Sequence, residues 1–316
     1  MKLYLGVDGG QSSTTALIGD ETGRVIGGGR GGPCNHVKGP EGRSKFLNAI
    51  AGCTAAACAQ ATLDNAAVVF ESACLGFSGG PADKEALLDE ILKTKQRIVT
   101  TDAMIALSGA MAGGPGIITI AGTGSIAYGR NREKRIARAG GWGYIYGDEG
   151  GGFDITRQAV RAALRHEEGW GPATSLRELL LSETGATDVN DLLHRFYTTD
   201  YPRPKIASFS TLVDRAAMDG DAVAHGILTN ASQQLATIAS SVRSQLFEQK
   251  EIVHVAYIGG VYRSTMLLDR FRMLVELEDG NHVSAPVYGP AAGALIEAYA
   301  AARCDVPLSN VPEIEK

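Results

Sequence analysis

The first residues that could do chemistry lie directly after the first apolar run. Residues 3–7 read LYLGV, and Asp8, Gly9, Gly10, Gln11, Ser12 and Ser13 follow. A carboxylate followed by glycines and hydroxyls can form a phosphate-binding turn, in which backbone N–H groups face an anion and Asp8 lies near a metal ion. The same residues are typical of a plain hairpin turn, because glycine adopts positive φ without steric cost. The turn alone leaves both interpretations open.

Three further loops follow apolar runs that we predict to be strands. Asp102 comes after residues 97–101, Gly122-Thr123-Gly124-Ser125 after residues 117–121, and Gly259-Gly260 after residues 252–258. In open α/β sheets, ligands bind outside the carboxyl ends of the strands. The four loops together therefore indicate a ligand site.

The opening pattern of the chain occurs a second time. "LYLGVDGGQSSTTALIGDETGRVIGGG" and "GIITIAGTGSIAYGRNREKRIARAG" both read as strand, glycine–hydroxyl turn, strand, polar turn and strand. Such self-similarity predicts an internal duplication. Two unrelated hairpins are the alternative that this pattern leaves open.

The remaining chain is mostly helical by its apolar periodicity. We predict helices at residues 42–63, 83–93, 103–111, 155–168, 175–184, 188–197 and 221–250, a strand within 67–77, an extended loop at 201–205, and a short strand, Gly-Pro turn and helix from residue 287 onward.

Bulk composition excludes several classes of protein. The 316 residues suit two domains, and the composition of 44% hydrophobic and 21% charged residues is that of a globular protein. A net charge of −5 argues against a nucleic-acid partner. No run approaches the ~20 apolar residues of a membrane span, and the N-terminus does not read as a signal peptide. We expect a cytoplasmic protein without a membrane partner.

The cysteines and histidines indicate no metal or cluster site. The five cysteines are odd in number and contain no C-x-x-C, and the six histidines are scattered. We expect reduced thiols that behave as small buried hydrophobes.

Motifs along most of the chain resemble one family. They are "GVDGGQSST", "CNH", "GFSGG", "TTDA", "IAGTGSIAYG", "GGWGYIYGDEG", "YIGGVYR" and "GPAAGAL". In this order they resemble the N-acetylglucosamine kinase and BadF/BadG/BcrA/BcrD ATPase family of the sugar kinase/Hsp70/actin superfamily. The resemblance implies an α/β fold of two duplicated RNase H-like, actin-like ATPase lobes with a nucleotide and sugar cleft. The lobes would be residues 1–113 and 114–289, with a C-terminal helix at 290–316 packing back on the first.

The resemblance also implies ATP and Mg²⁺ as cofactors. Asp8 would hold Mg²⁺ through water, and Asp8 to Ser13 would form the first phosphate loop. The second phosphate loop would be Gly122, Thr123 and Gly124, and the adenosine motif would be Gly259 and Gly260.

A small-molecule amino sugar is the implied substrate. Its contacts would be Asn35, Ser78, Gly79, Ser125, Trp142, Asp148 and Glu149. Asp102 falls at the family's general base, which would accept the proton of a sugar hydroxyl. The alternatives are that Asp102 caps the helix at 103–111, and that Asp148 or Glu149 is the base.

Two departures from the family pattern concern specificity. Gln11 stands where the family often has a third glycine, and "GDEGGGFD" replaces the usual "GDEGS" with an aromatic pair. Asp154, a carboxylate near the expected pocket, could favour a free amine, so glucosamine stands beside N-acetylglucosamine.

We therefore expect an ATP-dependent hexosamine kinase acting on a ring hydroxyl, the 6-hydroxyl. One alternative is an ATPase that activates a partner dehydratase or reductase, although such activators hold a cluster with cysteines that this sequence does not arrange. Another is a sugar-sensing regulator. Homodimers are frequent in the family, but no residue pattern here demands one.

Overall fold

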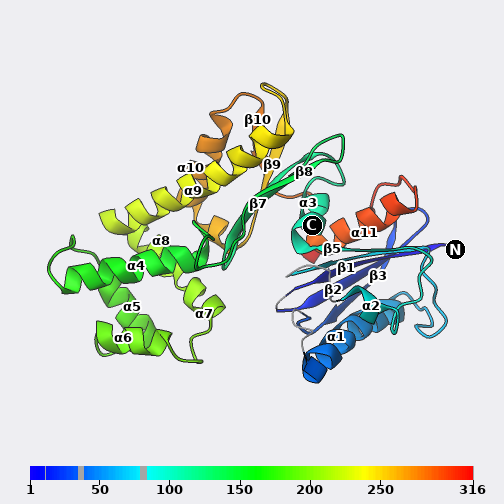
Figure 1. The fold of residues 1–316 in the computed structure, drawn as a ribbon, viewed down its shortest axis with the longest axis horizontal. Helices are drawn as coiled ribbons and strands as arrows, with labels where there is room; N and C mark the ends of the chain where they lie inside the picture. The colour runs from blue at the N-terminus through cyan, green and yellow to red at the C-terminus, as the bar shows by residue number, and fades with distance from the viewer. Residues whose placement is uncertain (11, 35–38, 79–83, 316) are drawn as a thin grey trace. The chain divides into compact units, whose positions relative to one another are not determined.

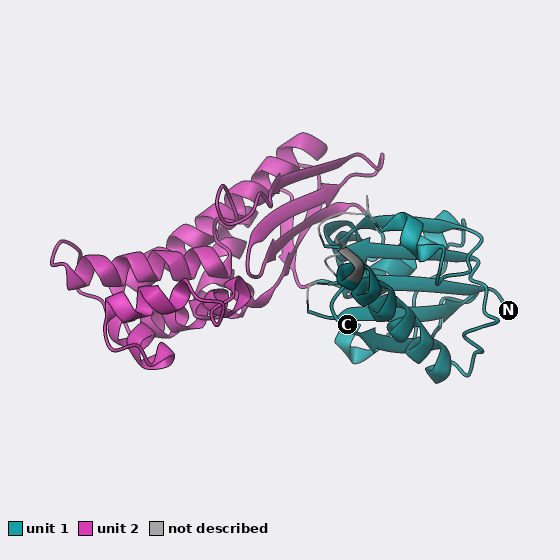
Figure 2. Cartoon of the chain, turned by 60° about the horizontal axis from the view of Figure 1, so that its bottom comes forward, with its two compact units in different colours: residues 1–114, 286–316 teal, residues 115–285 magenta. Residues whose placement is uncertain are grey.

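The chain divides into two compact units, each with its own sheet. The computed structural model describes residues 1–10, 12–34, 39–78 and 84–315 (Figure 1). One unit comprises residues 1–114 and 286–316, and the other comprises residues 115–285 (Figure 2). Each unit contains a five-stranded sheet.

The first unit is built on a mixed sheet with the strand order β3-β2-β1-β4-β5. Its strands are β1 Leu3–Gly9, β2 Thr14–Asp20, β3 Val25–Gly31, β4 Ser72–Phe77 and β5 Arg97–Thr101. β1, β2 and β3 are antiparallel, and β1, β4 and β5 are parallel. Its helices are α1 Gly39–Gln60, α2 Glu85–Leu88, α3 Asp102–Ala110 and α11 Pro290–Ala301. α1 covers one face of the sheet, and α3 and α11 cover the other (Figure 1).

Glycines in β3 let α1 lie directly on the sheet. A Cβ added at Gly27 or Gly29 would lie 2.2 or 2.0 Å from the carbonyl oxygen of Ala57 or Cys53 in α1. No side chain fits at that distance, so backbone meets backbone. The glycines of β3 therefore allow α1 to pack closely on the sheet.

The second unit repeats the topology of the first. Its strands are β6 Gly116–Ala121, β7 Ser125–Arg130, β8 Ile136–Gly140, β9 Val253–Ile258 and β10 Asn281–Ser284, in the order β10-β9-β6-β7-β8. Read from β8, this is the pattern of the first sheet, with β6, β7 and β8 antiparallel and β6, β9 and β10 parallel. The predicted duplication is confirmed at the level of the fold.

Helices make up most of the rest of the second unit. They are α4 Gly152–Glu167, α5 Leu176–Thr184, α6 Val189–Phe196, α7 Arg203–Ser208, α8 Ser210–Met218, α9 Ala222–Leu246 and α10 Thr265–Glu276. α9 packs on β6, β7 and β8, and α10 packs on α9 and β10. One hydrophobic core joins α4, α5, α6, α8, α9 and α10 to the sheet.

Some predicted elements are wrong for identifiable reasons. The helix predicted at 83–93 is shorter in the structure, where α2 ends at Leu88. The Lys93 carbonyl accepts the backbone N–H of Phe70, so the chain is extended there. The predicted loop at 201–205 contains the start of α7, with Pro202 at the N-cap, because proline is tolerated in the first turn of a helix.

The strand predicted within residues 67–77 is confirmed as β4. Predictions near the C-terminus need correction. β10 was not predicted, whereas no strand forms at 287–288. The predicted helix at 290–316 ends at Ala301, and Glu313–Glu315 forms a separate 3₁₀ turn.

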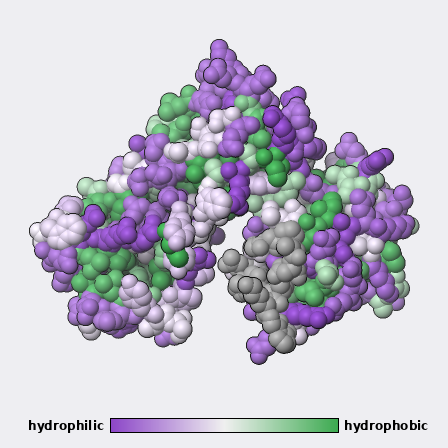
Figure 3. Space-filling model, viewed as in Figure 1, coloured by the Kyte–Doolittle hydropathy of each residue, from purple (hydrophilic) through white to green (hydrophobic). Residues whose placement is uncertain are grey.

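The surface is largely polar in the view of Figure 3, where hydrophilic residues cover much of the visible face. Among the described residues, no helix has the length and apolar character needed to cross a membrane. All five cysteines are free thiols, and four are buried; Cys304 is partly exposed, so the expectation that all five are buried is wrong for that residue.

Candidate active site

Three parallel strands of the first unit bring the candidate catalytic residues together. Asp8 lies in β1, Ser78 directly follows β4, and Asp102 directly follows β5. The Ser78 hydroxyl donates a 2.7 Å hydrogen bond to Asp102 Oδ2, and the Ser78 N–H donates to the Gly9 carbonyl at 3.3 Å. The carboxyl ends of β1, β4 and β5 therefore meet at these side chains.

Asp102 is not the N-cap of its helix. That position belongs to Thr101, whose hydroxyl accepts the N–H of Met104 at 3.3 Å. Asp102 is the first helical residue, and its Oδ1 accepts the N–H of Ala103 at 2.8 Å. The capping alternative is therefore wrong, and Oδ2 is directed at a hydroxyl group.

Asp8 lies in an unusual electrostatic environment for a carboxylate. Burial raises the pKa of Asp8 to about 7, and the negative charges of Glu315 and Asp102 add to this effect. A carboxyl group whose pKa is raised in this way lies where positive charge is in short supply. The surroundings of Asp8 would thus be stabilised by a cation.

This environment fits a hydrated Mg²⁺ ion. Within the part of the chain that the structure describes, no group of three or more His, Cys, Asp and Glu could hold a metal ion directly. Mg²⁺ gives up its water reluctantly and is commonly bound through one or two carboxylates and substrate phosphates. Asp8 is the residue that would hold it, through water.

The turn after Asp8 closes the hairpin between β1 and β2. Gly9 is buried at the end of β1, the Gly10 N–H donates to the Ser13 carbonyl at 3.0 Å, and Ser12 and Ser13 are exposed. The hairpin interpretation is therefore correct as geometry. A phosphate-binding role for the same turn stays a prediction.

The second glycine loop connects β6 to β7 and is fixed by its neighbours. The Gly122 N–H donates to the Gly124 carbonyl at 3.0 Å, and the N–H groups of Gly152 and Phe153 donate to the carbonyls of Gly122 and Thr123 at 2.8 and 3.0 Å. The start of α4 therefore holds this loop in place through the backbone.

The Gly259-Gly260 pair lies beside that loop. Gly259 has φ of +113°, and a Cβ there would lie 2.3 Å from the carbonyl oxygen of Ala121 at the end of β6. A Cβ on Gly260 would meet no atom within 4 Å. Gly259 is therefore required by the backbone, whereas Gly260 borders open space.

Asp148 connects the GDEG segment to the second glycine loop. It has an unusual positive φ of 63°, its Oδ1 accepts the N–H of Gly143 at 3.3 Å, and a Cβ on Gly124 would lie 2.3 Å from its Oδ2. The Ser125 hydroxyl donates to the Glu149 carbonyl at 2.6 Å. A non-glycine residue held at positive φ often marks a functional position.

Trp142 is 68% exposed, and the guanidinium of Arg138 lies 4.4 Å from the centre of its ring. It therefore offers an apolar surface to a ligand instead of filling the core. An exposed ring beside polar groups suits the face of a sugar.

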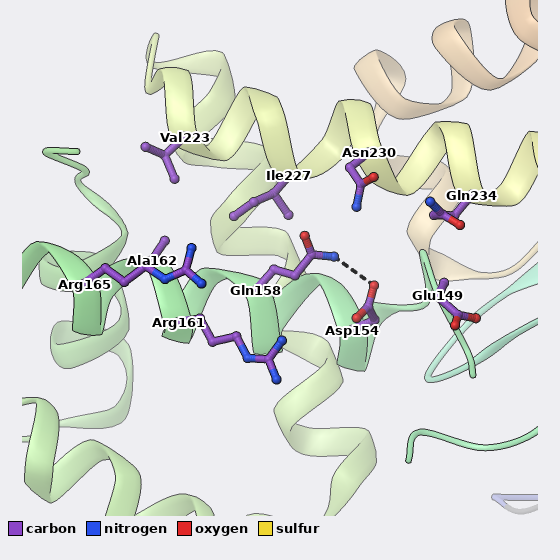
Figure 4. A pocket seen from close by; sticks show the side chains of 10 residues that line it. All are labelled: Glu149, Asp154, Gln158, Arg161, Ala162, Arg165, Val223, Ile227, Asn230 and Gln234. Atoms are coloured by element: carbon purple, nitrogen blue, oxygen red, sulfur yellow. Dashed lines mark hydrogen bonds between the residues drawn. The ribbon is translucent and has the colours of Figure 1, made fainter. Parts of the chain in front are cut away.

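A groove of about 420 Å³ between α4 and α9 contains the side chains of Glu149 and Asp154 (Figure 4). Asp154 is buried, and its carboxylate accepts hydrogen bonds from Arg157 at 2.5 Å, from Gln158 at 2.9 Å and from the Gly150 N–H at 3.1 Å. Its charge is already paired with Arg157. Asp154 therefore offers no unpaired carboxylate to an amine.

Three predicted contact residues, Gln11, Asn35 and Gly79, lie outside the described residues. Sequence reasoning missed Thr101, the true helix cap, and Glu315, whose charge acts on Asp8. A Thr before an Asp at a helix start is a readable signal, because both are favoured caps. Nothing in the sequence near Glu315 connects it to residue 8.

Comparison with known proteins gives the family. The model of the BadF/BadG/BcrA/BcrD ATPase family matches residues 5–298. The chain belongs to this family. The match covers both units, and the chain has the family's two-lobed, actin-like ATPase fold.

Relatives of this family member include two named kinases. The N-acetylmuramic acid/N-acetylglucosamine kinase of Clostridium acetobutylicum is 36% identical over 210 residues, 65% of this chain and 69% of that protein. The N-acetyl-D-glucosamine kinase of Dictyostelium discoideum is 30% identical over 282 residues, 85% and 88% of the two chains. A crystal structure from Chromobacterium violaceum, provisionally named an N-acetylglucosamine kinase, is 27% identical with a TM-score of 0.74 and covers 94% of this chain and 98% of that one.

Proposed function

We propose that this chain is an ATP-dependent kinase that transfers a phosphoryl group to the 6-hydroxyl of N-acetylglucosamine or a close N-acetylated amino sugar. The observation that carries the proposal is the hydrogen bond from the Ser78 hydroxyl to Asp102, at the strand ends that also present Asp8. The names of the relatives in Clostridium acetobutylicum and Dictyostelium discoideum support the substrate class.

Asp102 is the proposed general base. Its Oδ2 already accepts a hydrogen bond from a hydroxyl, so a sugar hydroxyl in the same position could lose its proton to that oxygen. The sugar oxygen forms a bond to the γ-phosphorus, the bond from that phosphorus to the β–γ bridging oxygen breaks, and ADP leaves. Mg²⁺, when bound, would neutralise charge on the phosphates.

The pairing of Asp154 favours an N-acetyl sugar over glucosamine. An ammonium group at the 2-position of the sugar needs an unpaired carboxylate. The Asp154 carboxylate already accepts hydrogen bonds from Arg157, Gln158 and the Gly150 N–H. An acetamido group needs apolar surface and hydrogen-bond partners, and Trp142 offers exposed aromatic surface.

The partner-activating ATPase is the weaker interpretation. Such an activator needs cysteines that can reach a shared cluster, whereas Cys34, Cys53, Cys58 and Cys74 are buried. Burial raises the pKa of the Cys53 thiol to about 12, which opposes the thiolate form that ligates iron.

The test is ADP release by the purified protein with ATP and Mg²⁺. The panel would be N-acetylglucosamine, N-acetylmuramic acid, N-acetylmannosamine, glucosamine and glucose. We expect an N-acetylated sugar to give the largest stimulation, and a larger response to glucosamine would contradict the specificity argument. ADP release that no sugar changes would favour the partner-activating ATPase instead.

A further inference from the structure

The groove between α4 and α9 carries opposite charges at its two ends (Figure 4). Glu149 lies at one end and directly follows Asp148, and both residues are predicted sugar contacts. Arg161 and Arg165 line the other end from the later turns of α4. A volume of about 420 Å³ lies in the range of small-molecule sites, so a ligand that begins at Glu149 has room to continue toward the arginines.

The opposite wall of the groove is uncharged. α9 contributes two aliphatic and two amide side chains, Val223, Ile227, Asn230 and Gln234. Residues 222–246, which form α9, contain no Asp or Glu. This helix therefore offers hydrogen bonds and apolar surface to a ligand, but it offers the arginines no ion-pair partner.

The carboxylates that follow Arg165 or precede α9 are already engaged. Asp221 uses both carboxylate oxygens as acceptors for backbone N–H and hydroxyl groups. Glu167 forms an ion pair with Arg177, and Glu168 accepts the indole N–H of Trp170 at 2.5 Å. These three carboxylates are therefore not available to neutralise the arginines of the groove.

Both arginines keep donors that an anion can use. Arg161 is exposed, and along residues 1–10, 12–34, 39–78 and 84–315 its side chain makes no hydrogen bond, ion pair or ring contact. The guanidinium of Arg165 lies 4.9 Å from the centre of the Trp170 ring, and a stacked guanidinium keeps N–H donors along its edge. Residues four apart share one face of a helix, where two like charges repel each other and an anion would offset the repulsion.

The direction of the two side chains shortens the path from the predicted sugar contacts. Arg161 follows Asp154 by seven residues, which is about 10 Å along a helix axis. Side chains of a helix lean toward its N-terminus. Figure 4 shows both arginine side chains extending along α4 toward the end that holds Asp154. The positive charges therefore lie nearer to that end than the backbone of their residues does.

We propose that Arg161 and Arg165 form a subsite for an acidic substituent of the amino sugar, so that the preferred substrate is an N-acetylated amino sugar that carries a carboxylate. The sugar ring would lie at Asp148 and Glu149, and the substituent would extend along α4. A planar guanidinium suits this role, because it can donate two parallel N–H bonds to one carboxylate. This inference rests on the proposed function and deepens it by naming the class of substrate.

N-acetylmuramic acid is a suitable probe, because it is N-acetylglucosamine with an added lactyl ether that ends in a carboxylate. Steady-state phosphorylation would be measured with N-acetylmuramic acid, with its methyl ester and with N-acetylglucosamine. The ester keeps the bulk of the substituent but removes its charge. We expect kcat/KM for the acid to exceed that for the ester about tenfold, mainly through a lower KM, because the arginines bind this charge equally before and during phosphoryl transfer.

Substitution of the arginines tests which residues recognise the charge. We expect Arg161→Gln to lower the ratio of kcat/KM for N-acetylmuramic acid to that for N-acetylglucosamine about threefold, and Arg161→Gln/Arg165→Gln to lower it about tenfold. Arg215→Gln is the matched control. Arg215 is also an exposed helical arginine of the same unit, but it does not line the groove, so this variant should keep the native ratio.

Two results would overturn the inference while leaving the proposed function in place. One is a kcat/KM for the acid that is equal to or below that for the ester, with N-acetylglucosamine phosphorylated in the same assay. The other is a native ratio in the double variant. If the native protein phosphorylates no amino sugar, the inference and the proposed function both fail.

Discussion

The contact between Ser78 and Asp102 makes the base assignment testable at a single atom. Asp102→Asn keeps the size of the side chain and an oxygen that can accept from Ser78, but it removes the ability to take up a proton at neutral pH. We expect turnover to fall by a factor on the order of 10² or more, with sugar binding nearly unchanged. Steady-state kinetics and calorimetric titration of the sugar would measure the two quantities.

Asp148→Asn is the comparison for that prediction, because Asp148 is one of the two alternative bases, with Glu149. Its Oδ1 accepts the Gly143 N–H and its carboxylate packs against Gly124, so its replacement should disturb the loop more than the proton transfer. Native turnover in Asp102→Asn, or a larger loss of turnover in Asp148→Asn, would mean that Asp102 is not the base.

The two adjacent glycines after β9 separate a folding role from a binding role. Gly260→Ala adds a methyl group into open space, so the free energy of unfolding should change by no more than about 0.5 kcal/mol. If adenosine lies against this backbone, the methyl group should raise the Kd for ATP by about tenfold. Equilibrium denaturation and nucleotide titration would measure the two effects.

Gly259→Ala is the counterpart. Alanine at φ of +113° and 2.3 Å from the Ala121 oxygen is strained, and we expect a loss of about 1–3 kcal/mol in the free energy of unfolding. Native ATP affinity in Gly260→Ala would argue against the adenosine motif.

At the scale of elements, Asp221 connects the start of α9 to the start of α5. Its Oδ1 accepts the N–H groups of Val223 and Ala224 at 2.9 and 3.0 Å, and its Oδ2 accepts from Thr174 and Ser175. Asp221→Ala removes a cap and leaves these donors unpaired, so we expect a loss of about 1–2 kcal/mol in the free energy of unfolding. Urea denaturation at neutral pH would measure it.

This stabilisation should depend on pH. Burial alone would raise the pKa of Asp221, but hydrogen bonds from Ala224, Thr174 and Ser175 outweigh it and hold the pKa below the usual value. The stabilisation is therefore complete above the unfolded pKa of about 4 and is lost as pH falls through the lower folded pKa. The stability difference between native protein and Asp221→Ala should shrink from pH 5 to pH 2, and a constant difference would contradict this assignment.

At the scale of the whole molecule, the chain passes between its two units twice, between residues 114 and 115 and between residues 285 and 286. A kinase must exclude water from phosphoryl transfer, and closure of two lobes on their ligands is a common means. We expect the radius of gyration to fall when sugar and a non-hydrolysable ATP analogue are both bound. Small-angle scattering would measure this, with either ligand alone as the control, and identical curves in all states would contradict closure.

The sequence by itself determined the repeated β-β-β pattern, the glycine loops and the family, because strand alternation and backbone turns at glycine are local properties. It also placed Asp8 and Asp102 at the ends of two strands. The parallel pairing of β1 with β4 and of β4 with β5 brings these strand ends to the same edge of the sheet.

Only the tertiary structure decided what depends on contacts between remote residues. It ended α2 early through the pairing of Phe70 with Lys93, and it paired Asp154 with Arg157. It also brought Glu315 to the start of α11, where its charge acts on Asp8. No local pattern carries these facts, because burial and charge–charge interactions depend on distance in space and not on separation along the chain.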